Sequence, residues 1–350
     1  MNKINFKFNY KLNIFIFYYI CKKNILLNIM FNSLLPNINL SIYGLKLNRK
    51  IFAWFLAILI IYIISDYSKN KNPSSNIIEY ESFVDFFDNN TIYDEYYANL
   101  YDKIFYSEEK NLNEIRYIHE HAISKWKNKE DISILDLGCG TGKHLEVLSK
   151  KYKTTGLDKS QDMIAKARKN LQNIKYLSKP ILVNGDITNS DLFDGNKFSH
   201  LMCMFFTFYY IQDKRVFFKN CNYWLKKDGI LCLHIVNRKK FDPILDKASP
   251  FPMFSLQRYS EDRPSKSVLI FNQFRYETEF KFNSDKGTFT ENFKFFNKKN
   301  QSRNNIHTFY MPSIRQILSI ARQYGFKILG NSDLTNAGFE YQYIFFMQKK

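Results

Sequence analysis

The sequence predicts an α/β fold, in which a doubly wound, mostly parallel sheet is followed by an inserted antiparallel layer. Three observations predict it. A glycine-rich loop stands between an apolar strand and a helix, strands then alternate with helices, and a long stretch of alternating apolar and polar residues interrupts this order near the C-terminus. The chain has 350 residues, enough for one large domain with an appendage.

The glycine-rich loop follows an apolar run of strand length, residues 132–137. Gly138, Gly140 and Gly142 come next at alternating positions, and apolar residues return at helical spacing after Lys143. Glycine permits the backbone angles of a tight turn and leaves no side chain in the way of a ligand. A strand, a glycine loop and a helix N-terminus together place backbone N–H groups against a bound molecule.

Four more strands, separated by helices, are expected after the glycine loop. The second strand ends at Asp158, about 20 residues after the first glycine, where a Rossmann-like sheet hydrogen-bonds the hydroxyls of a ribose. The third strand ends at Asp186. Ligands of such sheets bind at the carboxyl ends of the strands. Residues 152–160, 180–188 and 198–211 are expected to contain the second, third and fourth strands, and residues 224–236 a helix end, a turn at Asp228 and Gly229, and the fifth strand.

Over roughly residues 92–348 the sequence resembles the class I S-adenosylmethionine-dependent methyltransferases. Their first motif, D-x-G-x-G-x-G after a hydrophobic strand, stands here at residues 136–142, and their G-D-[AIL] element stands at residues 185–187. The resemblance implies a Rossmann-like, seven-stranded methyltransferase sheet with S-adenosyl-L-methionine as cofactor. A nicotinamide dinucleotide enzyme fits less well, because its G-x-G-x-x-G fingerprint places the third glycine one position later.

The resemblance also implies where the cofactor lies. The glycine loop is expected along its methionine part, Asp158 at the ribose, and Asp186 with Ile187 beside the adenine. The residues expected to bind the cofactor are Asp136, Gly138, Cys139, Gly140, Gly142, Asp158, Lys159, Met163, Asp186, Ile187, Met204 and Tyr101.

The segment before the first strand, residues 93–126, is helical in pattern, and Tyr97 and Tyr101 fall on one face of it. In the methyltransferase superfamily such a segment closes over the cofactor, and an LYD turn like residues 100–102 recurs in members acting on small amines and amino sugars. Tyr101 is therefore expected to contact the cofactor. The alternative is that both tyrosines only pack the helix against the sheet.

The inserted layer, residues 238–311, interrupts the strand–helix order. Residues 267–282 alternate in polarity, residues 288–296 return after a turn, and a third run at 304–311 leads into a helix at 312–324. About three antiparallel strands are expected. An inserted sheet at this position resembles the substrate-covering lid of glycine- and sugar-amine-type N-methyltransferases, which suits a small-molecule acceptor. The closing antiparallel hairpin of the family is expected in residues 325–334 and 340–350.

Candidate catalytic residues are those that could take a proton from the acceptor. A neutral amine needs no strong base, whereas a hydroxyl or phenol usually does. The candidates are His307 in the lid and Tyr209, or its neighbour Tyr210, after the fourth strand. The alternative for His307 is an ordinary solvated strand histidine. His200 and His234 lie within expected core strands and are expected to pack there.

Composition bears on the partners. The net charge is +18, but the lysines accompany an excess of Asn, Ile, Phe and Tyr along the whole chain, so no specific nucleic-acid binding is expected. The N-P-P-[YF] signature of amino-group methylation on adenine, cytosine or glutamine is absent at residues 203–210. The five cysteines form no C-x-x-C pair and have no His at ligand spacing, so we expect no metal and free thiols in a reducing compartment.

The N-terminal part, residues 1–76, is a hydrophobic and linker region with a candidate membrane segment at 51–64. As a helix that segment is about 21 Å long, shorter than a bilayer core of roughly 30 Å. We expect a membrane-associated protein with a cytosolic catalytic domain, or a cytoplasmic protein if the segment is no anchor. The expected methyltransferase domain is 77–350, with its core at 92–237, the lid at 238–311 and the closing helix and hairpin at 312–350.

The sequence therefore predicts an S-adenosylmethionine-dependent methyltransferase that acts on a small molecule, at nitrogen. An RNA methyltransferase, including one for the cap guanine, is the alternative that the positive charge favours. A cofactor-binding protein without catalysis is the alternative outside the enzymes. The oligomeric state has no signal in the sequence.

Overall fold

The computed structural model describes residues 41–42, 45–46, 83–243, 265–297 and 301–350. Of the unit formed by Phe8–Glu81, it describes only an antiparallel pair of short strands, β1 (Ser41–Ile42) and β2 (Leu45–Lys46). The candidate membrane segment at 51–64 lies outside the described residues, and membrane association stays a prediction. Among the described helices, none is both long and apolar enough to cross a bilayer.

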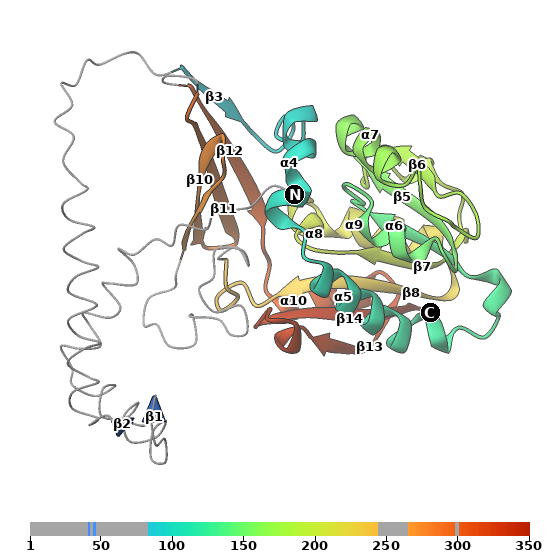
Figure 1. Ribbon diagram of the computed structural model, residues 1–350. Helices are drawn as coiled ribbons and strands as arrows, with labels where there is room; N and C mark the ends of the chain where they lie inside the picture. The colour runs from blue at the N-terminus through green and yellow to red at the C-terminus, as the bar shows by residue number, and fades with distance from the viewer. Residues whose placement is uncertain (1–40, 43–44, 47–82, 244–264, 298–300) are drawn as a thin grey trace. The chain divides into compact units, whose positions relative to one another are not determined.

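The larger unit is built on a seven-stranded sheet with strand order β13-β14-β8-β7-β4-β5-β6 (Figure 1). Neighbouring strands from β8 to β6 are parallel, and β14 pairs antiparallel with both β8 and β13. The predicted doubly wound sheet with its closing hairpin is confirmed. Its strands are β4 (Ser133–Leu137), β5 (Lys153–Asp158), β6 (Ile181–Asn184), β7 (Phe198–Cys203), β8 (Leu225–Val236), β13 (Phe326–Asp333) and β14 (Gln342–Lys349).

Most helices begin at a side chain that accepts a backbone N–H and so replaces a missing helical bond. Ser160 caps α7 in this way, and Ser313 forms a capping box with Gln316 at α10. The helices are α4 (Glu95–Phe105), α5 (Glu108–His121), α6 (Lys143–Leu148), α7 (Gln161–Asn170), α8 (Thr207–Tyr210), α9 (Lys214–Trp224) and α10 (Ile314–Gln323). Short 3-10 turns lie at Ile123–Lys125, Lys129–Asp131, Ser190–Leu192 and Thr335–Ala337.

The segment 93–126 is helical as predicted, but it contains two helices because Ser107 starts a new one. Ser107 accepts the Lys110 N–H at 3.4 Å, and the backbone at Tyr106 and Ser107 is extended. Residues 100–102, expected as a turn, lie inside α4. There Asp102 accepts a hydrogen bond from the Thr141 hydroxyl at 2.5 Å, which ties α4 to the glycine loop.

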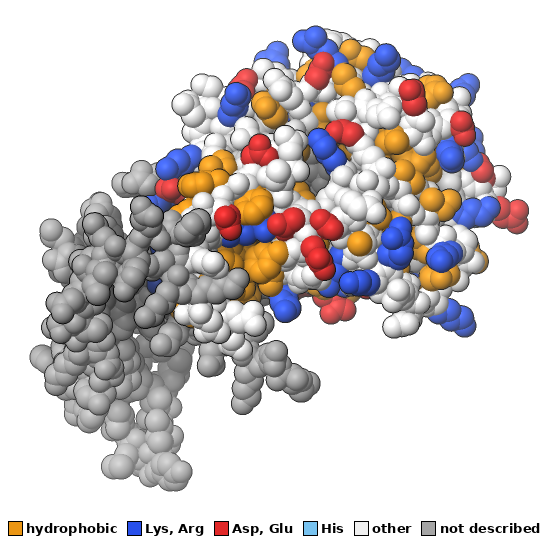
Figure 2. Space-filling model, turned by 90° about the horizontal axis from the view of Figure 1, so that it is seen from above, with side chains coloured by type: hydrophobic (Ala, Val, Ile, Leu, Met, Phe, Trp, Pro, Cys, Tyr) orange, Lys and Arg blue, Asp and Glu red, His pale blue; other side chains and the backbone are white. Residues whose placement is uncertain are grey.

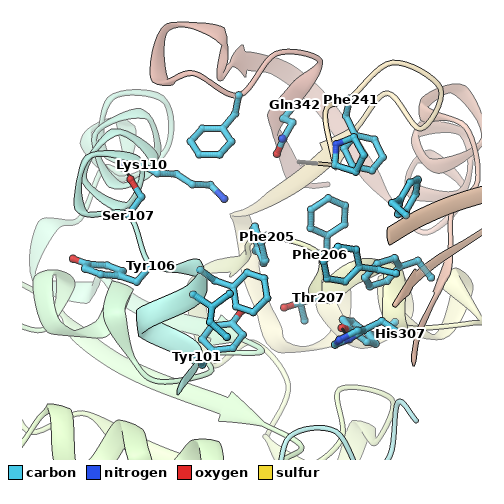
Figure 3. Close-up of a pocket in the computed structure, with 18 of the residues that line it drawn as sticks. Tyr101, Tyr106, Ser107, Lys110, Phe205, Phe206, Thr207, Phe241, His307 and Gln342 are labelled. Carbon is cyan, nitrogen blue, oxygen red and sulfur yellow. Dashed lines mark hydrogen bonds between the residues drawn. The ribbon is translucent and has the colours of Figure 1, made fainter. Parts of the chain in front are cut away.

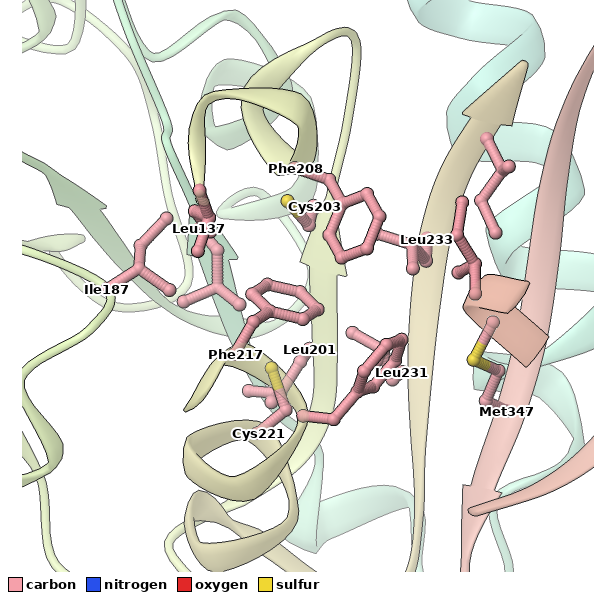
Figure 4. Packing of buried hydrophobic residues seen from close by; sticks show 14 of the residues in the cluster. Leu137, Ile187, Leu201, Cys203, Phe208, Phe217, Cys221, Leu231, Leu233 and Met347 are labelled. Carbon is pink, nitrogen blue, oxygen red and sulfur yellow. The ribbon is translucent and has the colours of Figure 1, made fainter. Parts of the chain in front are cut away.

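The main core lies between the sheet and α9. Phe217 and Cys221 of α9 pack against the apolar face of β7 and β8, which presents Leu201 and Leu231 (Figure 4). All four side chains are fully buried. Truncating a buried phenylalanine such as Phe217 to alanine typically costs about 3–5 kcal/mol, so this packing contributes strongly to the stability of the larger sheet.

A second, five-stranded sheet has the order β3-β12-β11-β10-β9 (Figure 1). About three strands were expected. The run 267–282 forms two strands because residues 271–273 turn between them, and a further strand comes from ahead of α4. This strand, β3, pairs in parallel with β12, a contact of long sequence separation. The strands are β3 (Phe83–Phe87), β9 (Lys266–Ile270), β10 (Phe274–Asn283), β11 (Lys286–Phe295) and β12 (Gln301–Tyr310).

Helix α4 connects the two sheets. The ring of Tyr97 packs against Phe293 of β11, and the same apolar cluster includes Met163 of α7. The tyrosines of α4 therefore stand between the glycine-loop end of the larger sheet and the apolar face of the smaller one.

Charged side chains are interspersed on the face shown in Figure 2, where Lys and Arg alternate with Asp and Glu. On the smaller sheet, for example, Glu277 pairs with Arg275 at 2.6 Å and with Lys294 at 2.8 Å. Exposed pairs of this kind contribute only about 0–1 kcal/mol each. These pairs place the negative charge of Glu277 next to the positive charges of Arg275 and Lys294 on the smaller sheet.

Candidate active site

The glycine loop after β4 has the backbone geometry that its sequence predicts. Gly138, Gly140 and Gly142 have φ values of +73°, +54° and +79°, a region that disfavours residues with a Cβ. A Cβ at Gly138 would lie 2.3 Å from the side chain of Thr207, so the loop and α8 touch there. A Cβ at Gly140 would meet nothing within 4 Å. Gly140 therefore borders open space in which a ligand fits.

Asp158, at the end of β5, holds this loop. Its carboxylate accepts the Gly140 N–H at 2.8 Å and the Ser160 N–H at 2.9 Å. Burial raises the pKa of Asp158, although the two N–H groups act in the opposite direction. A carboxylate has about four lone-pair sites, so two remain for hydroxyl donors of a ligand.

A cavity, which we call the glycine-loop cavity, opens beside these groups. Its lining contains most of the residues expected to bind the cofactor. These are Gly138, Gly140, Asp158, Lys159, Met163, Asp186, Ile187 and Tyr101. At its rim Asp186 forms an ion pair with Lys159 at 3.2 Å. Burial raises the pKa of Asp186, but bonds from Thr188 and Lys159 outweigh it and the pKa is lowered.

Four of the expected residues are buried and do not line this cavity: Asp136, Cys139, Gly142 and Met204. Gly142 is the N-cap of α6, and Cys139 and Met204 belong to apolar clusters. Burial raises the pKa of Asp136 to about 6, and its Oδ2 has no hydrogen-bond partner in the part of the chain that the structure describes. These four residues therefore pack within the protein instead of bordering the glycine-loop cavity.

A second cavity, the aromatic cavity, lies next to the first. Rings from α4, from the segment after β7 and from β12 surround it, and Lys110 of α5 extends into it (Figure 3). The ammonium of Lys110 lies 4.0 Å from the ring centre of Phe205, over its face. The residues common to both cavities are Tyr93, Tyr101, Thr207 and Tyr210. Two molecules that fill the two cavities would meet at these side chains.

His307 lies at the wall of the aromatic cavity and is only 2% exposed, so it is not a solvated strand histidine. Its Nε2 lies 2.7 Å from Glu291 Oε2, and its Nδ1 lies 2.5 Å from the hydroxyl of Tyr210. Burial by itself raises the pKa of Glu291, but His307, together with hydrogen bonds from Tyr276 and Asn305, holds it below its ordinary value.

The neighbouring tyrosines 209 and 210 point in different directions. Tyr209 is fully buried, and its hydroxyl accepts the Val236 N–H at 2.8 Å in the core. It lines neither of the cavities described above. Tyr210 lines both of them. The structure therefore gives Tyr209 a packing position and places Tyr210 where a ligand can reach it.

The other two histidines considered above lie in the core, as expected. Burial lowers the pKa of both His200 and His234 to about 4, so both are neutral at physiological pH. Among the described residues, no three His, Cys, Asp or Glu side chains converge as metal ligands do.

Sequence inspection missed Glu291 and Tyr93. The signal for Glu291 was present, since residues alternate between the two faces of a strand. Phe289, Glu291 and Phe293 share one face, and that face is apolar apart from the carboxylate. Tyr93 had no local signal, because it precedes α4 and reaches Tyr210 only through the tertiary fold, at 2.7 Å between hydroxyls.

Parts of the chain are similar in sequence to known proteins. Residues 134–229 match the family model of a methyltransferase domain. A stretch of 87 residues, 25% of this chain, is 38% identical to dTDP-3-amino-3,4,6-trideoxy-alpha-D-glucopyranose N,N-dimethyltransferase of Streptomyces venezuelae. Another of 148 residues, 41% of this chain, is 32% identical to an uncharacterized protein of Methanocaldococcus jannaschii. These matches span 33% and 51% of the length of the two relatives.

Solved structures share the fold. An S-adenosylmethionine-dependent methyltransferase from Clostridium acetobutylicum superimposes with a TM-score of 0.54 at 19% identity, covering 73% of this chain and 98% of its own. The CcbJ methyltransferase of Streptomyces caelestis superimposes with a TM-score of 0.55 at 12% identity, covering 75% and 99%.

Proposed function

We propose that this chain, which contains a class I S-adenosylmethionine-dependent methyltransferase domain, methylates the nitrogen of a small-molecule amine. The observation that carries the proposal is the pair of adjoining cavities. One has the glycine loop and Asp158, the other is lined mainly by aromatic rings, and they meet at four side chains that belong to both. Transfer between two bound molecules needs such proximity and alignment.

The residues of the glycine-loop cavity fit S-adenosyl-L-methionine. Gly140 borders open space, Asp158 keeps two acceptor sites for the ribose hydroxyls, and Asp186 with Ile187 is proposed to flank the adenine. When bound, the cofactor supplies a methyl group on a sulfonium and leaves as a neutral thioether.

An amine is favoured as acceptor by the lining of the aromatic cavity. Tyr93 stands with its ring centre 5.4 Å from that of Tyr97 and 6.4 Å from that of Tyr101. The faces of such rings attract a cationic group within about 6 Å. The names of two relatives support the same class of acceptor. One is the Streptomyces venezuelae N,N-dimethyltransferase reported above, and the other is the dTDP-3-amino-3,6-dideoxy-alpha-D-glucopyranose N,N-dimethyltransferase of Streptomyces fradiae, 35% identical over 85 residues.

The test is a methylation screen of the full-length protein with methyl-labelled cofactor. The panel contains small amines, amino sugars including dTDP-linked 3-amino sugars, lipids, capped RNA and transfer RNA. We expect label in an amine, and much less label with an Asp158→Ala variant at a cofactor concentration near the Kd of the wild type. Label confined to RNA at moderate salt would overturn the proposal in favour of RNA methylation. Cofactor binding without label in any compound would favour a protein that binds the cofactor without catalysis.

A further inference from the structure

A buried carboxylate, Glu291 of β11, is the centre of a polar cluster in the otherwise apolar face of the smaller sheet. Glu291 is 0% exposed. It accepts hydrogen bonds from the Tyr97 hydroxyl at 2.8 Å, the Asn305 amide at 2.7 Å, His307 Nε2 at 2.7 Å, and the Tyr276 hydroxyl. Four donors compensate its charge, which a buried carboxylate requires in order to stay ionised.

The ionised carboxylate sets the direction of the hydrogen bonds that lead away from it. A carboxylate only accepts, so the proton of a neutral His307 is on Nε2, and Nδ1 presents a lone pair. That lone pair accepts the hydroxyl of Tyr210 at 2.5 Å, and the oxygen of Tyr210 accepts the hydroxyl of Tyr93 at 2.7 Å. Burial raises the pKa of both tyrosines, so both phenols remain protonated.

The two ends of this series of hydrogen bonds differ in their exposure to the cavities. Glu291 and His307 are 0% and 2% exposed, and both ring nitrogens of His307 are engaged. Tyr210 and Tyr93 are partly exposed and line both cavities. A molecule at the junction of the cavities can therefore hydrogen-bond to a tyrosine oxygen of this series, but not to the imidazole.

We propose that Tyr210, His307 and Glu291 form a proton relay that deprotonates the ammonium form of the acceptor. This inference rests on the proposed function, and it gives the acceptor class as an amine that binds as a cation. Tyr210 is the catalytic residue because it contacts the acceptor, whereas His307 and Glu291 act through it.

The transfer balances within the protein and the acceptor. The acceptor nitrogen gives one proton to the oxygen of Tyr210 as the hydroxyl proton of Tyr210 passes to His307 Nδ1. The nitrogen keeps its electron pair and becomes a neutral nucleophile. His307 becomes an imidazolium that is stabilised by the carboxylate of Glu291, 2.7 Å from Nε2. When the junction of the cavities is open to water, the proton on His307 Nδ1 returns to Tyr210, and Tyr210 gives a proton to water.

Other titratable groups around the relay bear on any pH dependence. They are Tyr93, Tyr97 and Tyr101 at α4, Tyr276 of β10, and Arg303 of β12 with its partner Asp94. Burial raises the pKa of the four tyrosines further above neutrality. These four tyrosines therefore stay protonated near neutrality, and their titration contributes nothing to a pH dependence there.

The first experiment needs no acceptor. Histidine-labelled full-length protein is examined by ¹⁵N NMR, and His307→Gln identifies the signals of His307. We expect a neutral ring with its proton on Nε2 at pH 7.5. In Glu291→Gln the amide can donate to Nε2, so we expect the proton to move to Nδ1, while the signals of His234 stay unchanged as a control. A wild-type ring with its proton on Nδ1, or on both nitrogens, would overturn the relay.

The second experiment uses an amine that the methylation screen identifies. Below the pKa of that amine, we expect Tyr210→Phe to lower kcat by roughly 100-fold, the usual scale of general acid–base catalysis. Above that pKa the free amine predominates, and most of the loss should disappear. Tyr223→Phe, on the exposed side of α9, controls for the substitution.

An equal loss at every pH would show that Tyr210 only positions the acceptor, and no loss would show that no relay operates. If no amine is methylated, the proposed function fails, and the tautomer of His307 still decides the direction of the relay.

Discussion

Asp158→Ala tests the assignment of the ribose site. The carboxylate accepts the Gly140 N–H at 2.8 Å and the Ser160 N–H at 2.9 Å, and in the proposed complex it also accepts two ribose hydroxyls. Charge-assisted hydrogen bonds are worth about 1.5–3 kcal/mol each, and water replaces part of that loss when the site is open. We expect cofactor binding to weaken by about 2–4 kcal/mol, which is roughly 30- to 700-fold in Kd.

The assay is titration calorimetry of the full-length protein with S-adenosyl-L-methionine, together with the unfolding temperature of each variant. Asp194→Ala is the matched control, because that side chain is 94% exposed and its Lys197 partner lies 4.0 Å away. The control should bind as the wild type does. An Asp158→Ala protein that is folded and binds with an unchanged Kd would refute the ribose assignment and the role of the carboxylate in ordering the loop.

Three further predictions concern the loop, the core and acid stability. Gly140→Val should abolish cofactor binding in calorimetry, because the valine side chain fills the open space beside the loop that the cofactor would occupy. The protein should stay folded by circular dichroism, because an added Cβ meets no protein atom within 4 Å, although φ is +54°. Tyr209→Phe should lower the free energy of unfolding in urea by about 1–3 kcal/mol, since a buried N–H loses its acceptor. Burial raises the pKa of Glu114, but Lys110 and His144 outweigh it and lower the pKa to about 2. Because the pKa of Glu114 is lower in the folded than in the unfolded protein, this carboxylate stabilises the fold above about pH 4.5. Roughly 3 kcal/mol of the free energy of unfolding should be lost as the pH falls toward 2, and Glu114→Gln should reduce this dependence of stability on pH.

The tertiary structure decided which residues of the predicted site face a ligand. Tyr209 and Tyr210 are adjacent and chemically identical, yet one bonds to β8 in the core and the other lines both cavities. The direction of each follows from how the short helix α8 packs, which no local pattern encodes. Glu291 likewise could be assigned to the site only from the tertiary structure, in which strands β10 and β12 place Tyr276 and His307 within hydrogen-bond distance of its carboxylate.

The sequence by itself determined the elements whose causes are local. Glycine loops, strand-length apolar runs and alternating polarity predicted the order β4 to β8, the closing hairpin and the inserted layer, because backbone angles and side-chain periodicity act between near neighbours. Only the tertiary structure decided the parallel pairing of β3 with β12, the position of α4 between the two sheets and the junction of the cavities. These depend on contacts between residues about 200 positions apart, such as Tyr97 with Glu291, and loop closure over that distance leaves no signature in either segment alone.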